Sequence, residues 1–189
     1  MEKKIKEIIN NSISTKIKIL QDDNLLKNIK KIIEIMLEVY QNNKKVILCG
    51  NGGSASDALH IEGELLGRLK KERKSLSTIT LNSNQATITA IANDYGYDKI
   101  FQRQLEGVGS EGDLLIVLST SGNSMNIINV LEQAKLQNIK TVALLGNNGG
   151  KCIGKADISL VVPSNEAARI QESHIMIGHI ICELVEENF

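Results

Sequence analysis

This 189-residue chain has few aromatic residues and no excess of charge of either sign. It contains no Trp, two Phe and three Tyr, and its 22 basic residues are balanced by 22 acidic ones. Nucleic-acid binding usually requires a basic surface, and single strands are commonly held by aromatic side chains on which bases stack. The composition therefore argues against nucleic acid as a partner. The many Lys residues alternate with Glu and Asp, which is typical of a solvated surface.

Cysteines are also few, and no long apolar run is present. Cys49, Cys152 and Cys182 are far apart and form no C-x-x-C pair, which excludes a disulfide framework and the usual cysteine-zinc site. The first residues, MEKKIKEIINNSIS, are amphipathic, so we expect no signal peptide, no membrane span and no membrane partner. Reduced, buried thiols and a cytoplasmic location are the resulting expectation.

What the chain does contain is an alternation of amphipathic stretches and short apolar runs. Isoleucines recur every four residues from Ile5 to Ile17, and a second apolar period runs from Leu25 to Tyr40, which predicts two leading helices. Apolar runs that predict buried strands then alternate with helical stretches. The strands are expected at 45–50, 77–81, 113–119, 141–146 and 157–162, and the helices at 54–69, 84–93, 98–108, 124–137 and about 165–187.

This alternation predicts an α/β fold. Continuous apolar strands separated by helices are typical of a parallel sheet covered on both faces. We expect a doubly wound, five-stranded parallel sheet in a flavodoxin-like sandwich of three layers, within a single domain spanning residues 1–189. Residues 1–42 form its N-terminal helical extension. The isoleucine stripe of this extension is longer than is needed to cover the sheet of a single subunit. An exposed apolar stripe usually marks an interface between subunits.

Ligands of such a sheet bind beyond the carboxyl ends of its strands, and the first loop there is CGNGGSASDALH. Gly50, Gly52 and Ala55 fit the dinucleotide pattern G-x-G-x-x-A. However, residues 82–84, after the second strand, are Asn and Ser instead of the acidic residue that binds ribose. A plain turn would need one or two glycines. Three of them, beside Asn51, suggest close approach of the backbone to a polar ligand.

The third strand ends in STSGNS, before a helix expected to start near Met125. A helix N-terminus attracts anions, and hydroxyls donate hydrogen bonds to phosphate oxygens. No G-K-[ST] follows, which excludes a nucleoside triphosphate loop. The plainer alternative is a helix N-cap formed by Ser121 or Asn123. One cap needs one side chain, so four hydroxyls favour a phosphate-sized ligand: Ser119, Thr120, Ser121 and Ser124.

The helix after the glycine loop contains HIEGELLGR, which places His60 and Glu64 one turn apart on one face. An ordinary solvated face is the alternative for such a pair. On the last helix, Gln171 and His179 are eight residues apart, about 80° around the helix, so both can face one pocket.

Four motifs, in this order and at these intervals, resemble the sugar isomerase (SIS) domain and more narrowly the phosphoheptose isomerase family: GNGGSASDALH, ANDYGY, LSTSGNS and RIQESHIMIGHI. The resemblance covers nearly the whole chain. It implies conversion of sedoheptulose 7-phosphate to D-glycero-D-manno-heptose 7-phosphate through an enediol, the first step toward nucleotide-activated heptose for surface polysaccharide. It also implies a homotetramer with one zinc ion per subunit.

The resemblance further implies the roles of individual residues. Zinc would be held by His60, Glu64, Gln171 and His179, and Glu64 and His179 would be the catalytic pair. The sugar phosphate would contact ten residues: Asn51, Gly52, Gly53, Asn93, Asp94, Ser119, Thr120, Ser121, Ser124 and Gln171. Without the resemblance, Asn93 and Asp94 would be a helix C-cap and turn.

The reaction needs residues of these types. An aldose–ketose isomerisation requires a base near two carbons, an acid–base group at their oxygens, and positive charge beside the developing oxyanion. Glu64 offers a carboxylate, His179 an imidazole that titrates near neutrality, and zinc a Lewis acid. Because zinc stabilises the ionised carboxylate, a bound Glu64 is a poorer base. Glu64 therefore either leaves the metal during turnover or uses its second oxygen.

Several points stay open. Ala168 stands where some family members have Asp before RIQE, so no acid role is assigned there. A non-enzymatic relative binds the bacterial replication initiator and lacks the Glu. The alternative function is therefore a non-catalytic SIS module that binds a phosphosugar or a replication-initiation protein, and Glu64 favours the enzyme. Asp57 either orients His60 or caps the helix start, and His174 is expected on a helix surface or an interface.

Overall fold

The computed structural model describes the whole chain, residues 1–189, around a central parallel sheet. The strands are β1 (Val46–Gly50), β2 (Thr78–Thr80), β3 (Leu114–Ser119), β4 (Lys140–Leu145) and β5 (Ile158–Val161). They lie in the order β2-β1-β3-β4-β5, and every neighbouring pair is parallel. The predicted doubly wound five-stranded sheet is confirmed. The strand order reverses between β1 and β3, so the switch point at which ligands bind lies between these two strands.

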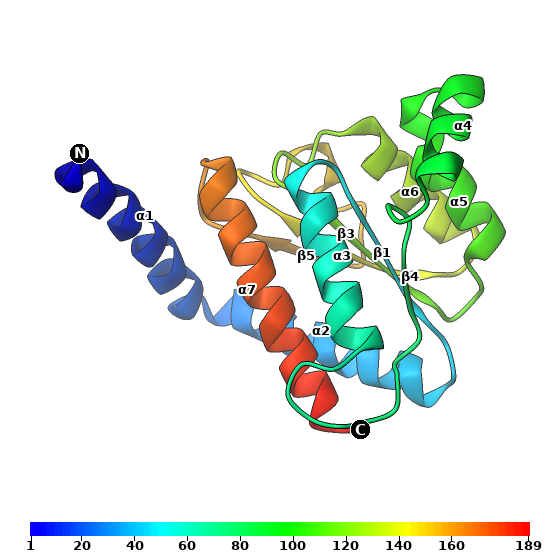
Figure 1. The fold of residues 1–189 in the computed structure, drawn as a ribbon, viewed down its shortest axis with the longest axis horizontal. Coiled ribbons are helices and arrows are strands. Elements are labelled where there is room, and N and C mark those ends of the chain that lie inside the picture. The colour runs from blue at the N-terminus through cyan, green and yellow to red at the C-terminus, as the bar shows by residue number, and fades with distance from the viewer.

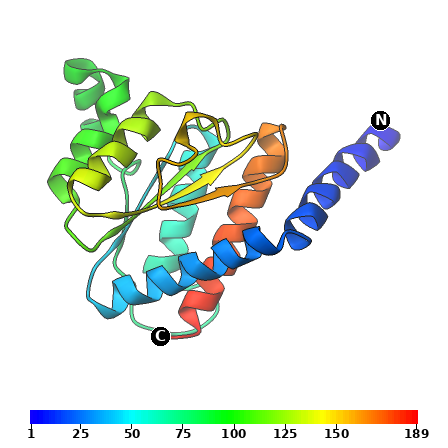
Figure 2. The same cartoon turned by 180° about the vertical axis from the view of Figure 1, so that it is seen from behind.

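Helices cover both faces of the sheet (Figures 1 and 2). One face packs against α2 (Asp23–Gln41), α3 (Gly53–Leu66) and α7 (Ala167–Glu186). The other packs against α5 (Ile100–Val108) and α6 (Met125–Leu136), and α4 (Gln85–Tyr95) packs outside them on α5 and the short 3-10 helix η1 (Tyr97–Lys99). A second 3-10 helix, η2 (Gly150–Cys152), lies between β4 and β5. Because successive side chains of a strand point to opposite faces, Leu48 belongs to one core and Cys49 to the other. All three cysteines are free and buried, as predicted.

Helix α1 (Glu2–Leu20) leaves the body of the molecule at an angle, and its N-terminus lies well away from the sheet (Figure 1). Near the middle of the helix, the hydroxyl of Ser12 donates to Glu172 of α7 at 2.6 Å. The predicted isoleucine stripe is exposed in the single chain, between 45% and 52% for each member: Ile5, Ile9, Ile13 and Ile17. None of the helices combines the length and the apolar composition that crossing a membrane requires.

One helix boundary differs from the prediction at residues expected in the site. The helix predicted over 84–93 continues to Tyr95, and its C-cap is Gly96, which adopts a φ of 94°. Asn93 and Asp94 therefore lie in the last turn of α4. The prediction that they form a C-cap and turn is wrong, because the glycine that can take a positive φ comes two residues after Asp94.

Candidate active site

The side chains of His60 and Glu64 on α3 and of His179 on α7 converge where the two helices meet. Nε2 of His60 lies 3.0 Å from Nε2 of His179 and 3.1 Å from Oε1 of Glu64. The three ligand atoms all lie within 4.8 Å of one another. Two ligands bound to a tetrahedral zinc ion at roughly 2.0–2.1 Å lie about 3.3 Å apart. The group therefore has the donor types and the spacing that suit such an ion.

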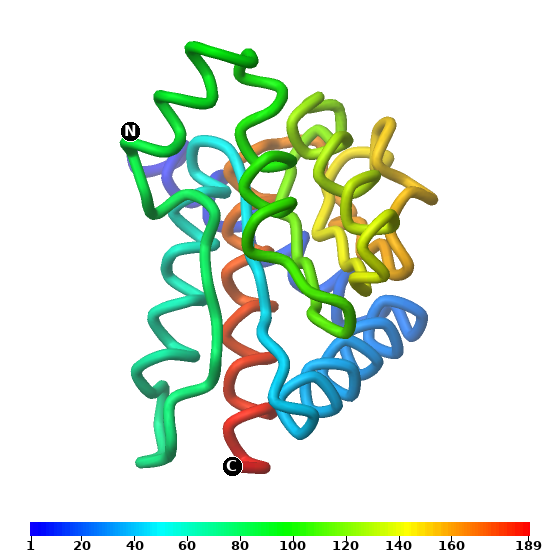
Figure 3. The backbone as a smooth tube through the Cα atoms, turned by 90° about the vertical axis from the view of Figure 1, so that its right-hand side faces the viewer, coloured from blue at the N-terminus to red at the C-terminus, as the bar shows by residue number.

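This convergence depends on the close, parallel packing of α3 and α7, which run side by side in Figures 1 and 3. Ile61 of α3 occupies the space beside Gly178 of α7, where an added Cβ would lie 2.7 Å from the Ile61 Cδ1. Near the start of α3, Gly53 leaves a similar space for the amide of Gln171. Both glycines are required for this approach, because a side chain at either would push the helices apart.

Gln171, the predicted fourth zinc ligand, lies at the same helix interface. Its half-buried amide contacts Gly53, two turns before His60 on α3. The N-cap of α3 is Gly52, whose φ of 55° favours glycine, and both glycines of this turn are exposed beyond the carboxyl end of β1. The role of Gln171 as a ligand and those of Gly52 and Gly53 as substrate contacts stay predictions.

Asp57 lies one turn before His60 and does not cap the helix, because α3 begins at Gly53. The capping alternative is therefore wrong. Oδ2 of Asp57 is buried and has no hydrogen-bond partner. Burial raises the pKa of Asp57 to about 6, and the charge of a protonated His60 opposes this increase. The remaining alternative, that Asp57 orients His60, stays a prediction.

His174 is fully buried, so the expectation of a helix-surface or interface residue is wrong. Its Nε2 lies 3.1 Å from the backbone oxygen of Leu145, at the end of β4, and its Nδ1 has no partner. Burial lowers the pKa of His174 to about 4, although the hydrogen bond to Leu145 opposes the shift. The neutral ring donates Nε2–H to this carbonyl and packs α7 against the sheet.

The STSGNS loop connects β3 to α6 and leaves the helix N-terminus open. The N-cap residue is Ser124, so the alternative in which Ser121 or Asn123 caps the helix is wrong. Its side chain makes no capping bond, and the backbone N–H groups of Ser124, Met125 and Asn126 have no partner in the chain. Unpaired amides at a helix N-terminus are suited to hold an anion.

The hydroxyls of this loop divide into two kinds. Oγ of Ser119 accepts from the amide of Gly122 at 3.1 Å, and Oγ of Ser121 accepts from the amide of Asn123 at 3.2 Å. These two bonds shape the loop, and both hydroxyls still have a proton to donate. The hydroxyls of Thr120 and Ser124 make no hydrogen bond and are partly exposed. All four can donate to a phosphate.

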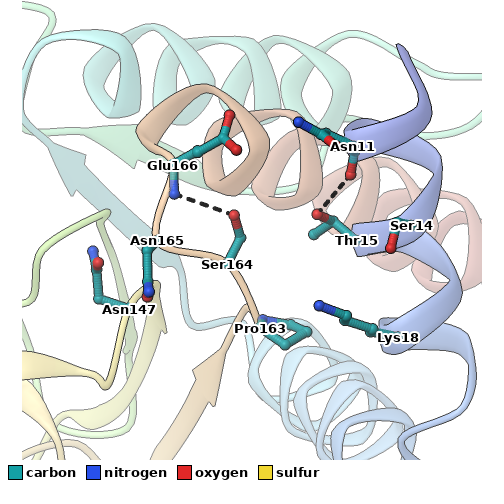
Figure 4. A pocket seen from close by; sticks show the side chains of 9 residues that line it. All are labelled: Asn11, Ser14, Thr15, Lys18, Asn147, Pro163, Ser164, Asn165 and Glu166. Atoms are coloured by element: carbon teal, nitrogen blue, oxygen red, sulfur yellow. Dashed lines mark hydrogen bonds between the residues drawn. The ribbon is translucent and has the colours of Figure 1, made fainter. Parts of the chain in front are cut away.

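Two polar hollows lie on this side of the molecule. One, of about 670 Å³, reaches the hydroxyl loop and is lined by Ser121, Asn123, Asn147, Asn148 and Asn165. The other, of about 530 Å³, lies between α1 and residues 163–166 (Figure 4). Neither is lined by His60, Glu64 or His179. The larger hollow thus meets the hydroxyl loop at Ser121 and Asn123, whereas the metal-ligand group opens on the surface, where the His60 side chain is 50% exposed.

Asn51 links the glycine loop to the hydroxyl loop at the switch point. Its amide exchanges two hydrogen bonds with the amide of Asn126, both at 2.9 Å. Its Oδ1 also accepts from the hydroxyl of Tyr97 at 3.1 Å. The sequence alone does not single out these two partners. Tyr97 lies within the motif ANDYGY, but nothing local marks Asn126, which is buried in the first turn of α6.

Asn93 and Asp94 lie on the outer helix α4. Nδ2 of Asn93 donates to Oδ1 of Asp94 at 2.8 Å, and both residues are exposed. No hydrogen bond joins them to the glycine loop, the hydroxyl loop or the metal-ligand group. Their role as substrate contacts stays a prediction.

Known proteins resemble this chain along nearly its whole length. A family model described as the SIS domain matches residues 10–146. The phosphoheptose isomerase of Sulfurimonas denitrificans is 50% identical over 187 residues, which cover 99% of this chain and 96% of that protein. A phosphoheptose isomerase structure from Francisella tularensis has a TM-score of 0.94 and 37% identity, covering 98% of this chain and 97% of that one. One from Neisseria gonorrhoeae has a TM-score of 0.93 and 34% identity, covering 98% of each chain.

Proposed function

The chain belongs to the phosphoheptose isomerase family of SIS domains, and from this premise we propose how it isomerises sedoheptulose 7-phosphate to D-glycero-D-manno-heptose 7-phosphate. It is an enzyme of heptose biosynthesis. The observation that carries the mechanism is the meeting of His60, Glu64 and His179, since a carboxylate and an imidazole side by side are what an enediol mechanism uses. This pairing also favours catalysis over a non-catalytic phosphosugar-binding module.

Glu64 and His179 are the proposed catalytic pair. Oε1 of Glu64 faces His60, and the second carboxylate oxygen makes no hydrogen bond in the chain. That second oxygen is free to take a proton from one carbon of the substrate and return it to the neighbouring carbon. The imidazole of His179 would move the other proton between the two substrate oxygens, because an imidazole ring can both accept and donate a proton through its nitrogens.

The proposed metal is zinc, held by His60, Glu64 and His179 with Gln171 as the fourth ligand. Imidazole nitrogens and a carboxylate oxygen form a common zinc site, whereas a Gln amide is a weak ligand. When bound, zinc supplies Lewis-acid polarisation of the substrate carbonyl. Asp57, one turn before His60, has a buried oxygen without a partner and is proposed to orient the His60 imidazole.

The proposed phosphate site is the hydroxyl loop at the start of α6. Its free amides and hydroxyls match the three acceptor oxygens of a phosphate group. Such a site anchors the substrate by the end that does not react. Remote binding of this kind positions the reacting carbons without contributing to the proton transfers. Asn51, held by Asn126 and Tyr97, lies between this loop and α3 and is proposed to contact the sugar.

A homotetramer is the proposed assembly. Two features of the single chain support it: the isoleucine stripe of α1 is exposed, and so is half of the His60 side chain. Exposed apolar stripes mark interfaces, and an enediol intermediate must be protected from water. Neighbouring subunits that pack on α1 and cover the metal-ligand group would meet both needs. Light scattering on the purified protein at micromolar concentration tests this, and a monomer would contradict it.

The decisive experiment is an isomerisation assay with sedoheptulose 7-phosphate, combined with metal analysis of the same purified sample. We expect turnover that is lost after treatment with a chelator and restored by zinc. Binding of the heptose phosphate without turnover, in zinc-loaded protein, would instead identify a non-catalytic phosphosugar-binding module.

A further inference from the structure

A buried ion pair lies at the end of the helix interface that forms the site. The side chains of Arg73, in the loop after α3, and Glu186, on α7, are 1% and 2% exposed, and Nε of Arg73 lies 3.3 Å from Oε1 of Glu186. Among the ion pairs of the chain it is the one in which both partners are buried to this degree. The sequence places Arg73 in the charged run KKERK, which is typical of a solvated surface, so its burial requires a reason.

Arg73 binds the carboxyl end of the helix that holds His60 and Glu64. Its Nη2 donates to the backbone oxygen of Glu64 at 2.7 Å, and its Nη1 donates to that of Leu65 at 2.9 Å. The last carbonyls of a helix have no partner within the helix and carry partial negative charge. A planar guanidinium can hold two of them at once, and here one of the two belongs to the proposed base itself.

Glu186 of α7 binds the same loop from the other helix. Its two oxygens accept from the backbone amides of Leu69 at 3.1 Å and Lys70 at 2.8 Å. Burial alone would raise the pKa of Glu186, but these amides and Arg73 hold it below its usual value, so the group stays ionised. Glu186 follows His179 by seven residues, or two helical turns, and so lies on the same face of α7.

We infer that Arg73 and Glu186 are positioning residues for the metal-ligand and catalytic group, an inference that rests on the proposed function. They tie the end of α3 to α7 at one side of the group, as the contact of Gly53 with Gln171 does at the other. With both ends fixed, Glu64 cannot slide or turn relative to His179. The pair touches neither substrate nor metal. It acts by holding the backbone of Glu64 in register with α7.

The informative variant is Arg73→Lys, which keeps the positive charge beside Glu186 but lacks the planar fork that spans two carbonyls. Zinc affinity is measured by competition with a chromophoric chelator, and kcat and KM are measured with sedoheptulose 7-phosphate. We expect zinc affinity and kcat to fall by about tenfold or more, the usual effect of losing a group that orients metal ligands. KM should stay near that of the parent, because the hydroxyl loop is untouched. Glu186→Gln, which keeps one acceptor oxygen, should behave alike.

The matched control is Lys70→Met. It breaks the 2.6 Å bridge from Lys70 to Glu183, which joins the same loop to the same helix but is 62% and 40% exposed. Exposed pairs contribute little, so zinc affinity and kcat should match those of the parent. An equal loss in Lys70→Met would mean that any change in this loop disturbs the site, and would overturn the assignment.

The outcomes separate this inference from the proposed function. If the parent turns over the heptose phosphate and folded Arg73→Lys keeps parental zinc affinity and kcat, the positioning role is wrong and the function stands. If the parent shows no turnover, the proposed function is wrong. The zinc affinities of the same variants then still test whether Arg73 and Glu186 position the metal ligands. Lower thermal stability with unchanged zinc affinity, or failure of both variants to fold, would assign the pair to stability alone and overturn the inference.

Discussion

His60 and His179 face each other through their Nε2 atoms at 3.0 Å, although 119 residues separate them in the chain. At this distance one ring nitrogen must donate and the other accept, unless a cation binds both lone pairs. A metal ion binds the lone pair of a neutral imidazole nitrogen, and here two ring nitrogens, one from each helix, face each other. The pair therefore presents two ligand atoms at close to the spacing that a tetrahedral zinc ion requires.

His60→Ala should weaken zinc binding first and reduce activity as a consequence. Removing a residue that only hydrogen-bonds to a metal ligand lowers metal affinity by about 10–100-fold. Removing a ligand itself should lower zinc affinity by more than this. Because Glu64 and His179 remain, excess zinc should restore part of the turnover. Chelator competition and a zinc titration of kcat measure the two effects. Full loss of activity that no zinc concentration relieves would show that His60 does more than bind metal.

Thr120→Ala should weaken binding of the sugar phosphate and leave zinc in place. Its hydroxyl is free in the chain, and losing a hydrogen bond to a charged group costs about 1.5–3 kcal/mol, or tenfold or more in affinity. Calorimetry with the substrate, alongside metal analysis, provides the measurement. Ser110→Ala is the control, since it removes a hydroxyl in the loop before β3, near the other end of the same strand. Unchanged affinity in Thr120→Ala would remove this residue from the phosphate site.

The fold could be predicted from the sequence because each strand and helix is marked locally. Runs such as KVILCG and DLLIVLS are apolar throughout, as buried parallel strands are, and the helices between them have the helical period. The order of elements then leaves few topologies. The end of α4 is not marked in this way, because two local signals compete: the polar pair Asn93–Asp94 and the glycine Gly96 can each end a helix, and the structure uses Gly96.

The site was only partly predictable, because its groups come from segments distant in sequence. His60 and Glu64 share one helix, so their spacing was enough to pair them. His174 shows the limit: a histidine on an amphipathic helix suggests a surface, and only the packing of α7 on β4 brings it against the Leu145 carbonyl. Arg73 shows the same limit, because its charged neighbours conceal a partner that lies 113 residues later.

Acid should destabilise the parent protein more than it destabilises His174→Gln. The pKa of His174 is lowered from 6.5 to about 4 in the folded chain, so between these values the unfolded chain binds the additional proton. Stability from this group is therefore complete above pH 6.5 and is lost as the pH falls toward 4. Between pH 7 and pH 5 the loss is about 2 kcal/mol for a shift of this size. Gln retains an N–H for the Leu145 carbonyl but does not titrate.

The measurement is urea unfolding of both proteins at pH 7 and pH 5, at equal protein concentration and with chelator present. The chelator is needed because metal binding itself depends on pH. Asp57, whose raised pKa acts in the opposite direction, is present in both proteins and cancels in the comparison. Equal losses in parent and variant would mean that His174 is not the source of the acid sensitivity.

Glu64→Gln should separate catalysis from binding. The amide keeps the size of the side chain and an oxygen for zinc, but it cannot accept a proton from carbon, so kcat should fall by roughly a hundredfold or more, the scale of general-base loss. Folding and phosphate binding should survive, since the backbone of Glu64 still accepts from Arg73 and the hydroxyl loop is unchanged. The control is Glu72→Gln, the same change at a side chain that is 88% exposed. The kcat values of both variants and of the parent are compared in fixed-time assays of heptose phosphate formation at saturating zinc. If Glu64→Gln isomerises sedoheptulose 7-phosphate as fast as the parent, Glu64 is not the base, and the proton must be taken by another group even though the chain belongs to this family.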